Sequence, residues 1–222
     1  MDDVCKTEPI DLISSFLLSL ETKDPELRQA ILEIKAKTRI DEILGGRYSL
    51  LFLLDLYHSF ENRSITLDAI MHEVKCLEGE INQSRTKPAS QFSRPPLKGL
   101  WHKHFYDSNI SGMVQNMMNA LNTYSIPYFE SKIEEAKTSG IEQYMTVEDI
   151  PHIVEDIVSR NLQKRSEEQR MTGEWIIYAN HNGVNYYLCI AKHKEGDESI
   201  RKRLDAACLL EFPFLKDLLP AS

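Results

Sequence analysis

Residues 173–191 read GEWIIYANHNGVNYYLCIA, and this stretch predicts a β-hairpin. Two runs rich in β-branched and aromatic residues, 174–179 and 184–191, flank Asn182-Gly183, the pair most typical of a two-residue hairpin turn. A lone hairpin is only marginally stable in water. We therefore expect it to pack on helices or to pair with a third strand, for which Leu100–Tyr106 is the best local candidate.

The rest of the chain shows the apolar spacing of helices. In residues 1–84, Asp24-Pro25 is a strong helix start, because Asp caps free amides and Pro suits the first helical position. Gly45-Gly46 is expected to end that helix. The other N-terminal helices are expected over Glu8–Leu20, over Tyr48–Phe60 at the centre of a bundle, and from a Thr66 cap to Ile81.

The central and C-terminal helices follow a loop over 85–99 that contains three prolines. Their expected ranges are Ser108–Leu121, Pro127–Lys137, Val147 to about Glu168 after a capping box at Thr146, and Asp197–Ala207. In the last helix Ile200 and Leu204 should face inward, and Arg201 and Arg203 outward.

These elements predict an α+β protein that is predominantly helical. It should have an N-terminal helical bundle (1–84), a basic and aromatic loop (85–107), and further helices with the C-terminal hairpin (108–222) that form one compact unit with the N-terminal part. The hairpin or small antiparallel sheet should pack on the helices.

Composition and charge limit the function classes. The chain has 26 basic and 34 acidic residues, a net charge of −8, which disfavours a dedicated nucleic-acid binder and suits a basic protein partner. The acidic N-terminus lacks a signal-peptide pattern, and no apolar run is long enough to cross a membrane. Four scattered cysteines suit reduced thiols. We expect a cytoplasmic protein that does not associate with membranes.

His102 and His104 are the most suggestive pair for chemistry. On a strand both imidazoles point to one face, where His181 or His193 would be a third metal ligand. Alternatively, His102, His104 and His193 would act as acid and base in a nuclease or phosphoesterase, with Lys103 or Lys192 stabilising the phosphorane. Surface or hydrogen-bonded histidines explain the same pattern more simply, so we assign no metal, no cofactor and no catalytic residue.

Two helical rows also carry ligand-type side chains at a spacing of four residues. They are Asp68, His72, Cys76 and Glu80, and Glu148, His152 and Asp156. One helix supplies too few converging groups for a closed site, so both rows are interpreted as solvated polar faces.

The loop from Arg85 to Lys103 is basic, contains no acidic residue and is interleaved with aromatics. Such a segment grips nucleic acid or forms a protein-binding hot spot, and a surface loop held down by its aromatics is the plainer alternative. The usual phosphate-loop, dinucleotide, hydrolase and zinc-protease signatures are missing.

Two stretches resemble segments of small uncharacterised bacterial proteins. They are PLKGLWHKHF at residues 96–105, and Gly173-Glu174-Trp175 running into Tyr186-Tyr187-Leu188. In its general character, small and acidic without a signature site, the chain is similar to immunity proteins and antitoxins that neutralise toxic nucleases. This resemblance in character implies protein binding. The two stretches bring no defined activity with them, so no catalytic residue is carried over.

The leading hypothesis is therefore an inhibitor that binds a basic toxic enzyme, such as a nuclease, with its acidic surface steering association. A His-dependent nuclease or phosphoesterase and an RNA-binding accessory protein are the alternatives. The expected partner-binding residues are Trp101, Phe105 and Tyr106 on the aromatic loop, and Asp2, Asp3, Glu8 and Asp11 near the N-terminus.

Overall fold

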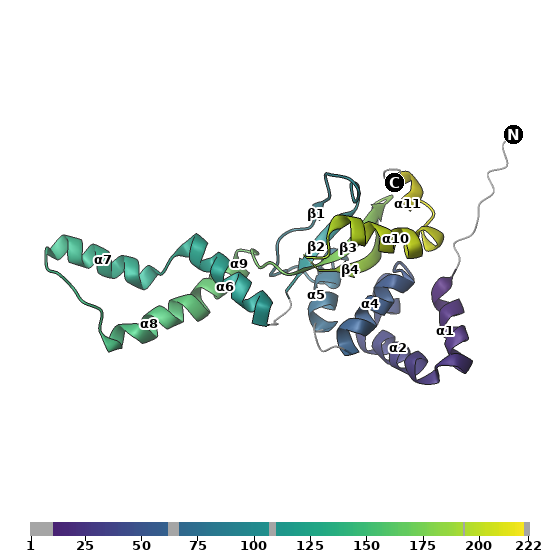
Figure 1. Ribbon diagram of the computed structural model, residues 1–222, viewed down its shortest axis with the longest axis horizontal. Coiled ribbons are helices and arrows are strands. Elements are labelled where there is room, and N and C mark those ends of the chain that lie inside the picture. Colours follow the sequence, from purple (N-terminus) through teal and green to yellow (C-terminus); the bar gives the residue numbers. More distant parts are fainter. Residues whose placement is uncertain (1–10, 62–66, 107–109, 193, 220–222) are drawn as a thin grey trace.

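A four-stranded antiparallel sheet lies between two groups of helices, and a separate pair of helical segments projects from it (Figure 1). The computed structural model describes residues 11–61, 67–106, 110–192 and 194–219. The strand order follows the sequence: β1 (Ser90–Gln91), β2 (Trp101–Phe105), β3 (Glu174–His181) and β4 (Val184–Ala191). The predicted α+β class is confirmed, and the Leu100–Tyr106 candidate is the third strand that the hairpin requires.

The hairpin forms as its sequence predicts. Asn182 and Gly183 have φ values of +53° and +80°, the left-handed pair that a tight two-residue turn needs. Farther along, Ile177 pairs with Cys189 and Tyr178 with Tyr187, so Leu188 is an extra residue in β4. This bulge breaks the simple alternation of faces along the strand.

The N-terminal helices cover one face of the sheet. They are α1 (Leu12–Lys23), α2 (Pro25–Thr38), α3 (Ile40–Leu44), α4 (Leu50–Glu61) and α5 (Leu67–Leu77). Apolar side chains of these helices form one core with residues of β2, β3 and β4. The core residues that the sheet contributes are Phe105, Ile176, Tyr178, Tyr187 and Ile190.

The local start and stop signals of these helices are partly confirmed. The Asp24 side chain accepts a hydrogen bond from the Leu27 amide at 3.0 Å, and Pro25 opens α2 as expected. The helix does not run on to Gly45, because Arg39 adopts a left-handed conformation (φ +53°) and separates α2 from α3. Gly45 ends the short α3 instead. The expected cap Thr66 lies outside the described residues.

The C-terminal helices cover the other face of the sheet with α10 (Asp197–Glu211) and α11 (Leu215–Leu218). Ile200 and Leu204 are buried there as predicted. The outward placement of Arg201 was wrong: only 8 % of it is exposed, and its Nη1 donates to the Pro96 carbonyl at 2.9 Å. Arg203 is also held inward, by an ion pair of 2.6 Å with Asp55 of α4.

The central helices form an arm that extends away from the sheet (Figure 1). It consists of α6 (Ile110–Tyr124) and α7 (Pro127–Ser139), which run outward, and a return through η1 (Val147–Asp149), α8 (Ile150–Glu155), the π-helical η2 (Asp156–Arg160) and α9 (Asn161–Glu167). The predicted capping box of Thr146 and Asp149 is present at the start of η1. The sequence range 108–222 thus includes both this arm and the β3–β4 hairpin, whereas β1 and β2 of the same sheet lie in the preceding range 85–107.

Asn116 joins the two sides of the arm at its base. Its Nδ2 donates to the Thr172 carbonyl at 2.7 Å, and its Oδ1 accepts from the Thr172 amide at 2.9 Å and from Arg165 Nε at 3.3 Å. Asn116 is fully buried. Its amide therefore links α6, to which Asn116 belongs, with α9 and with the segment that leads into β3.

Replacing Asn116 with alanine is expected to lower the free energy of local opening at the base of the arm by about 2 kcal/mol. The reason is that Thr172 and Arg165 keep their polar groups but lose a buried hydrogen-bond partner. Hydrogen exchange of the α6 and α9 amides should accelerate about 30-fold. Gln115→Ala, at the preceding exposed position, should leave exchange unchanged. Equal exchange rates in both variants would contradict this role.

Candidate functional sites

The two histidines of β2 lie on one face of the sheet, as predicted. Their ring centroids are 5.6 Å apart, and Trp175 packs beside both, at 5.1 Å from His102 and 6.3 Å from His104. His102 Nε2 is 3.1 Å from Ser90 Oγ, and His104 Nδ1 is 3.0 Å from the Gly173 carbonyl. The imidazoles are thus part of a hydrogen-bonded aromatic cluster.

The other residues proposed for the histidine chemistry lie elsewhere. His181 stacks on Phe214 at 4.2 Å, at the opposite end of β3 from Trp175. His193 lies outside the described residues. Within the described ranges no three His, Cys, Asp or Glu side chains are placed to hold a metal ion.

Lys103 points to the opposite face of β2 and is buried. Its Nζ lies 3.2 Å from the Glu73 carboxylate and donates to Ser84 Oγ at 2.8 Å and the Lys87 carbonyl at 2.7 Å. Its suggested role in stabilising a phosphorane beside His102 is therefore wrong, since the ammonium group lies on the other side of the strand. Lys103 instead ties β2 to α5 and the loop.

The aromatic loop is only partly available to a partner. Phe105, expected at a binding surface, is fully buried in the core, so its ring presents no surface to a partner. Trp101 is half-buried and stacks on Tyr178 at 6.4 Å, and Tyr106 is also half-buried. Four basic side chains of the loop are exposed: Arg85, Lys87, Arg94 and Lys98.

The two helical ligand rows do not form sites. Helix α5 ends at Leu77, so Glu80 lies beyond the helix that the first row requires. In the second row Asp156 is buried rather than solvated and accepts a hydrogen bond from the Tyr128 amide at 2.8 Å, while His152 stacks on Tyr128 at 4.9 Å. Asp156 and His152 therefore hold α7 against the returning chain of η2 and α8 through Tyr128.

Of the four acidic residues expected to bind a partner near the N-terminus, Asp11 is the one that the structure describes. Asp2, Asp3 and Glu8 lie outside the described residues. Asp11 accepts a hydrogen bond from the Ser14 amide at 2.9 Å and so caps α1. Hydrogen bonds from Ser14 hold the pKa of its carboxyl below the usual range. Asp11 also lines a cleft that the sequence did not indicate.

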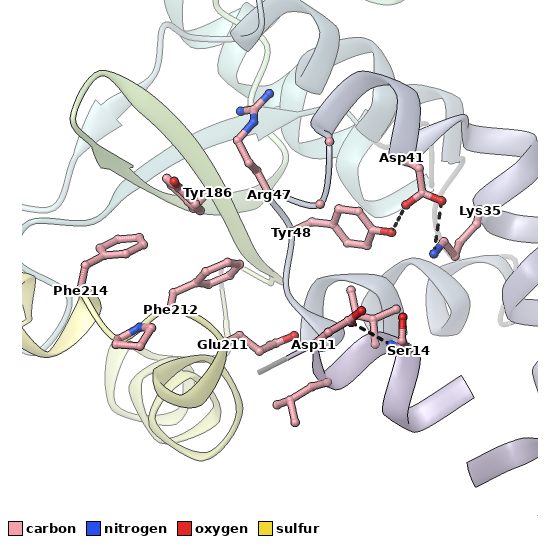
Figure 2. Close-up of a pocket in the computed structure, with 15 residues that line it drawn as sticks. Asp11, Ser14, Lys35, Asp41, Arg47, Tyr48, Tyr186, Glu211, Phe212 and Phe214 are labelled. Atoms are coloured by element: carbon pink, nitrogen blue, oxygen red, sulfur yellow. Dashed lines mark hydrogen bonds and ion pairs between the residues drawn. The ribbon is translucent and has the colours of Figure 1, made fainter. Parts of the chain in front are cut away.

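This cleft, of about 560 Å³, lies where six segments meet (Figure 2). It is lined by the start of α1, Lys35 of α2, Asp41 of α3, the loop that leads from α3 to α4, Tyr186 of β4, and the end of α10 with the following turn. Tyr186, Phe212 and Phe214 lie on one side of the cleft and Asp11, Ser14 and Asp41 on the other, with Glu211 between them (Figure 2). It is large enough for a small organic ligand.

Both basic side chains of the cleft already have carboxylate partners. Lys35 Nζ lies 3.2 Å from Asp41, which also accepts a hydrogen bond from the Tyr48 hydroxyl. Arg47 Nη2 lies 2.6 Å from Glu78. Burial, together with the Asp41 carboxylate, raises the pKa of Tyr48, so its phenol stays protonated.

Glu211 is the most unusual group in the cleft. Only 6 % of it is exposed, and its two carboxylate oxygens lie 2.9 and 3.1 Å from the Leu50 amide at the start of α4. Burial raises its pKa to about 7, although the Leu50 hydrogen bond acts in the opposite direction. The structure makes it the last residue of α10, which extends four residues beyond the predicted end at Ala207, and Phe212-Pro213-Phe214 follow it; nothing in this local sequence indicates a site.

The arm carries a second unusual surface. Twelve of the sixteen large apolar side chains that are exposed in the described part of the chain belong to it. Ile110, Val114 and Met118 form a stripe along α6, and Ile150, Val154 and Val158 form one along α8 and η2. The other six are Met113, Ile133, Ile141, Tyr144, Met145 and Val147.

The arm interior is polar where a helical hairpin would ordinarily be apolar. Asn116, Asp156, Asn161 and Arg165 are buried in it, and Ala120 is the only buried apolar residue among its described helices. Because the stripes are not used inside the arm, they are available outside it. Large contiguous exposed apolar patches are a feature of interaction surfaces.

The tip of the arm adds charge and shape to this surface. Residues 127–158 contain eight acidic and two basic residues, a net charge of −6. Between α7 and the returning chain lies an apolar groove of about 140 Å³, with Phe129, Ile133, Tyr144, Met145 and Ile153 among its lining residues. Sequence periodicity predicted these helices but not that their apolar faces remain uncovered.

Comparison with known proteins provides no further assignment: no family model, curated protein or solved structure matches the chain. No described helix has the length and apolar character needed to cross a membrane. Cys76, Cys189 and Cys208 carry free thiols.

Proposed function

We propose that this protein binds a basic protein partner through the α6–α9 arm and inhibits it, in the manner of an immunity protein or antitoxin. The observation that carries the proposal is the combination of exposed apolar stripes with a tip charge of −6. Apolar stripes supply contact area, and the surrounding carboxylates favour a partner of opposite charge. A toxic nuclease has this basic character, since its active site must accept phosphates.

A basic partner fits the arm better than a second copy of the chain does. Two tips that each carry −6 repel one another. The cations between the tip and the base of the arm already have partners. Arg160 pairs with Glu155 and Asp156, and Arg170 pairs with Glu168 at 3.4 Å. Lys164 Nζ lies 4.6 Å from the ring centre of Tyr124, and Arg165 is buried and donates to Asn116. The alternative nuclease function loses the support of Lys103, which is buried on the far face of β2.

The test compares two variants that remove similar apolar area. The arm variant is Tyr144→Ser with Ile150→Ser, and the control is Leu18→Ser with Leu210→Ser, at positions that are 69 % and 56 % exposed outside the arm. We expect the wild type and the control to retain one basic protein from the native host's lysate in equal amount. The arm variant should bind that protein 10- to 100-fold more weakly by calorimetry.

Inhibition is tested with the purified partner. Its enzymatic activity should fall in proportion to added protein until one equivalent is present, and the arm variant should inhibit only at higher concentration. Equal binding by the arm and control variants would remove the arm as the interface. Capture of RNA instead of protein, with a steep salt dependence, would favour the nucleic-acid alternative through the loop from Arg85 to Lys103.

A further inference from the structure

We propose that the cleft lined by Glu211 and the Tyr186–Phe212–Phe214 rings binds an organic cation, an ammonium or guanidinium group on an apolar body. This inference is independent of the arm, since no residue of α6–α9 lines the cleft, and α1 and α10, which do line it, lie away from the arm (Figure 1). Three features support it: the charge left uncompensated in the cleft, the aromatic wall, and the protected position of Glu211.

The uncompensated charge of the cleft is negative. Lys35 and Arg47 are each held by a carboxylate, at 3.2 Å from Asp41 and 2.6 Å from Glu78. Glu211 and Asp11, in contrast, form no ion pair with any described lysine or arginine. An anion entering the cleft would meet these carboxylates and no uncommitted cation among the lining residues, whereas a cation would be attracted by both.

The aromatic wall adds a second kind of recognition for a cation. Tyr186 lies 5.3 Å from Phe212 and 4.9 Å from Phe214, ring centre to ring centre, and both pairs are edge-on. Edge-on packing turns the negative faces of neighbouring rings in different directions, as in the aromatic cages that hold alkylammonium groups. The same rings supply apolar contact for the body that carries the charge.

Glu211 is positioned to make the charge interaction strong. It is the last residue of α10 and lines the cleft between the aromatic and the acidic sides, and the Leu50 amide fixes its carboxylate. Because the group is largely removed from water, its attraction to a cation is screened less than that of a surface carboxylate. A bound cation would compensate this buried charge, which the described part of the protein leaves with one backbone donor.

Calorimetry at pH 8 with benzylamine and with its neutral analogue benzyl alcohol tests the proposal. We expect benzylamine to bind at submillimolar concentration and benzyl alcohol at least tenfold more weakly. A second pair, N-acetyl-arginine amide and the corresponding citrulline amide, distinguishes a cation carried on a peptide from a free amine. Binding of either cation with discrimination against its neutral analogue supports the site, and the preferred cation identifies the source.

Variants locate the binding. Glu211→Gln keeps the hydrogen-bond acceptor but removes the charge, and Phe214→Leu keeps apolar volume but removes the ring face; each should weaken binding at least tenfold. Asp217→Asn, an exposed carboxylate of α11, should bind as the wild type does. Thermal unfolding confirms that each variant is folded. Equal binding of cation and neutral analogue, or unchanged affinity in both cleft variants, would overturn the proposal.

Discussion

Replacing Lys103 with methionine is expected to lower the free energy of unfolding by about 3–5 kcal/mol, because removing one partner of a buried ion pair leaves the other charge uncompensated. Only 4 % of the Lys103 side chain and 3 % of the Glu73 side chain are exposed. Ser84 and the Lys87 carbonyl also lose the donor that joins the loop to β2. Urea denaturation followed by circular dichroism measures the change.

Two further variants separate the ion pair from the loss of a lysine. Lys98→Met, at an exposed position in the same loop, should change stability by less than about 0.5 kcal/mol. Glu73→Leu combined with Lys103→Met removes both charges and should recover at least half of the lost stability. If the double variant is as unstable as Lys103→Met alone, hydrogen bonds of the loop, and not the unpaired carboxylate, dominate the loss.

The sequence predicted the parts of the fold whose signals are local. The Asn182-Gly183 turn requires two left-handed residues, and the β-branched runs around it admit little other than a hairpin. Because an isolated hairpin is only marginally stable, a third strand was expected, and Leu100–Tyr106 was the best local candidate. Asp24-Pro25 likewise set the start of α2, because capping depends on neighbours within one turn.

Properties that depend on distant segments were not predictable in this way. The helical pattern predicts that Arg201 and Arg203 face the solvent. The Pro96 carbonyl and Asp55, each more than ninety positions away in the sequence, hold these two side chains inward instead. Lys103 was assigned to a basic surface, although Glu73 of α5 pairs with it in the interior. Spacing shows which face a side chain takes, but not what lies against that face.

The candidate sites also divide into those that a local sequence pattern predicts and those that only the tertiary fold creates. The shared face of His102 and His104 follows from the two-residue period of a strand, and the structure confirms it. The cleft joins residues from Asp11 to Phe214 through the tertiary fold, so no local pattern marks it. The arm stripes have ordinary helical spacing, and only the structure shows that the arm interior is filled by polar side chains instead.

Glu211→Gln is expected to stabilise the protein at pH 8 and to remove part of its pH dependence. The pKa of Glu211 is raised from 4.5 to about 7 by burial, so the folded state favours the protonated carboxyl. The resulting stabilisation is complete below pH 4.5 and is lost as the pH rises through 7. The loss amounts to about 3 kcal/mol, and glutamine, which stays neutral, avoids it.

The measurement is the unfolding free energy of both proteins from pH 4 to pH 8. The two curves should nearly coincide near pH 4 and diverge by about 3 kcal/mol at pH 8, with the variant more stable. Asp55, whose pKa burial raises to about 6, contributes equally to both curves and cancels in the difference. Parallel curves would show that Glu211 titrates normally.

An organic cation bound in the cleft should lower the pKa of Glu211, because it favours the charged carboxylate. It should therefore stabilise the wild type increasingly above pH 7 and the glutamine variant much less.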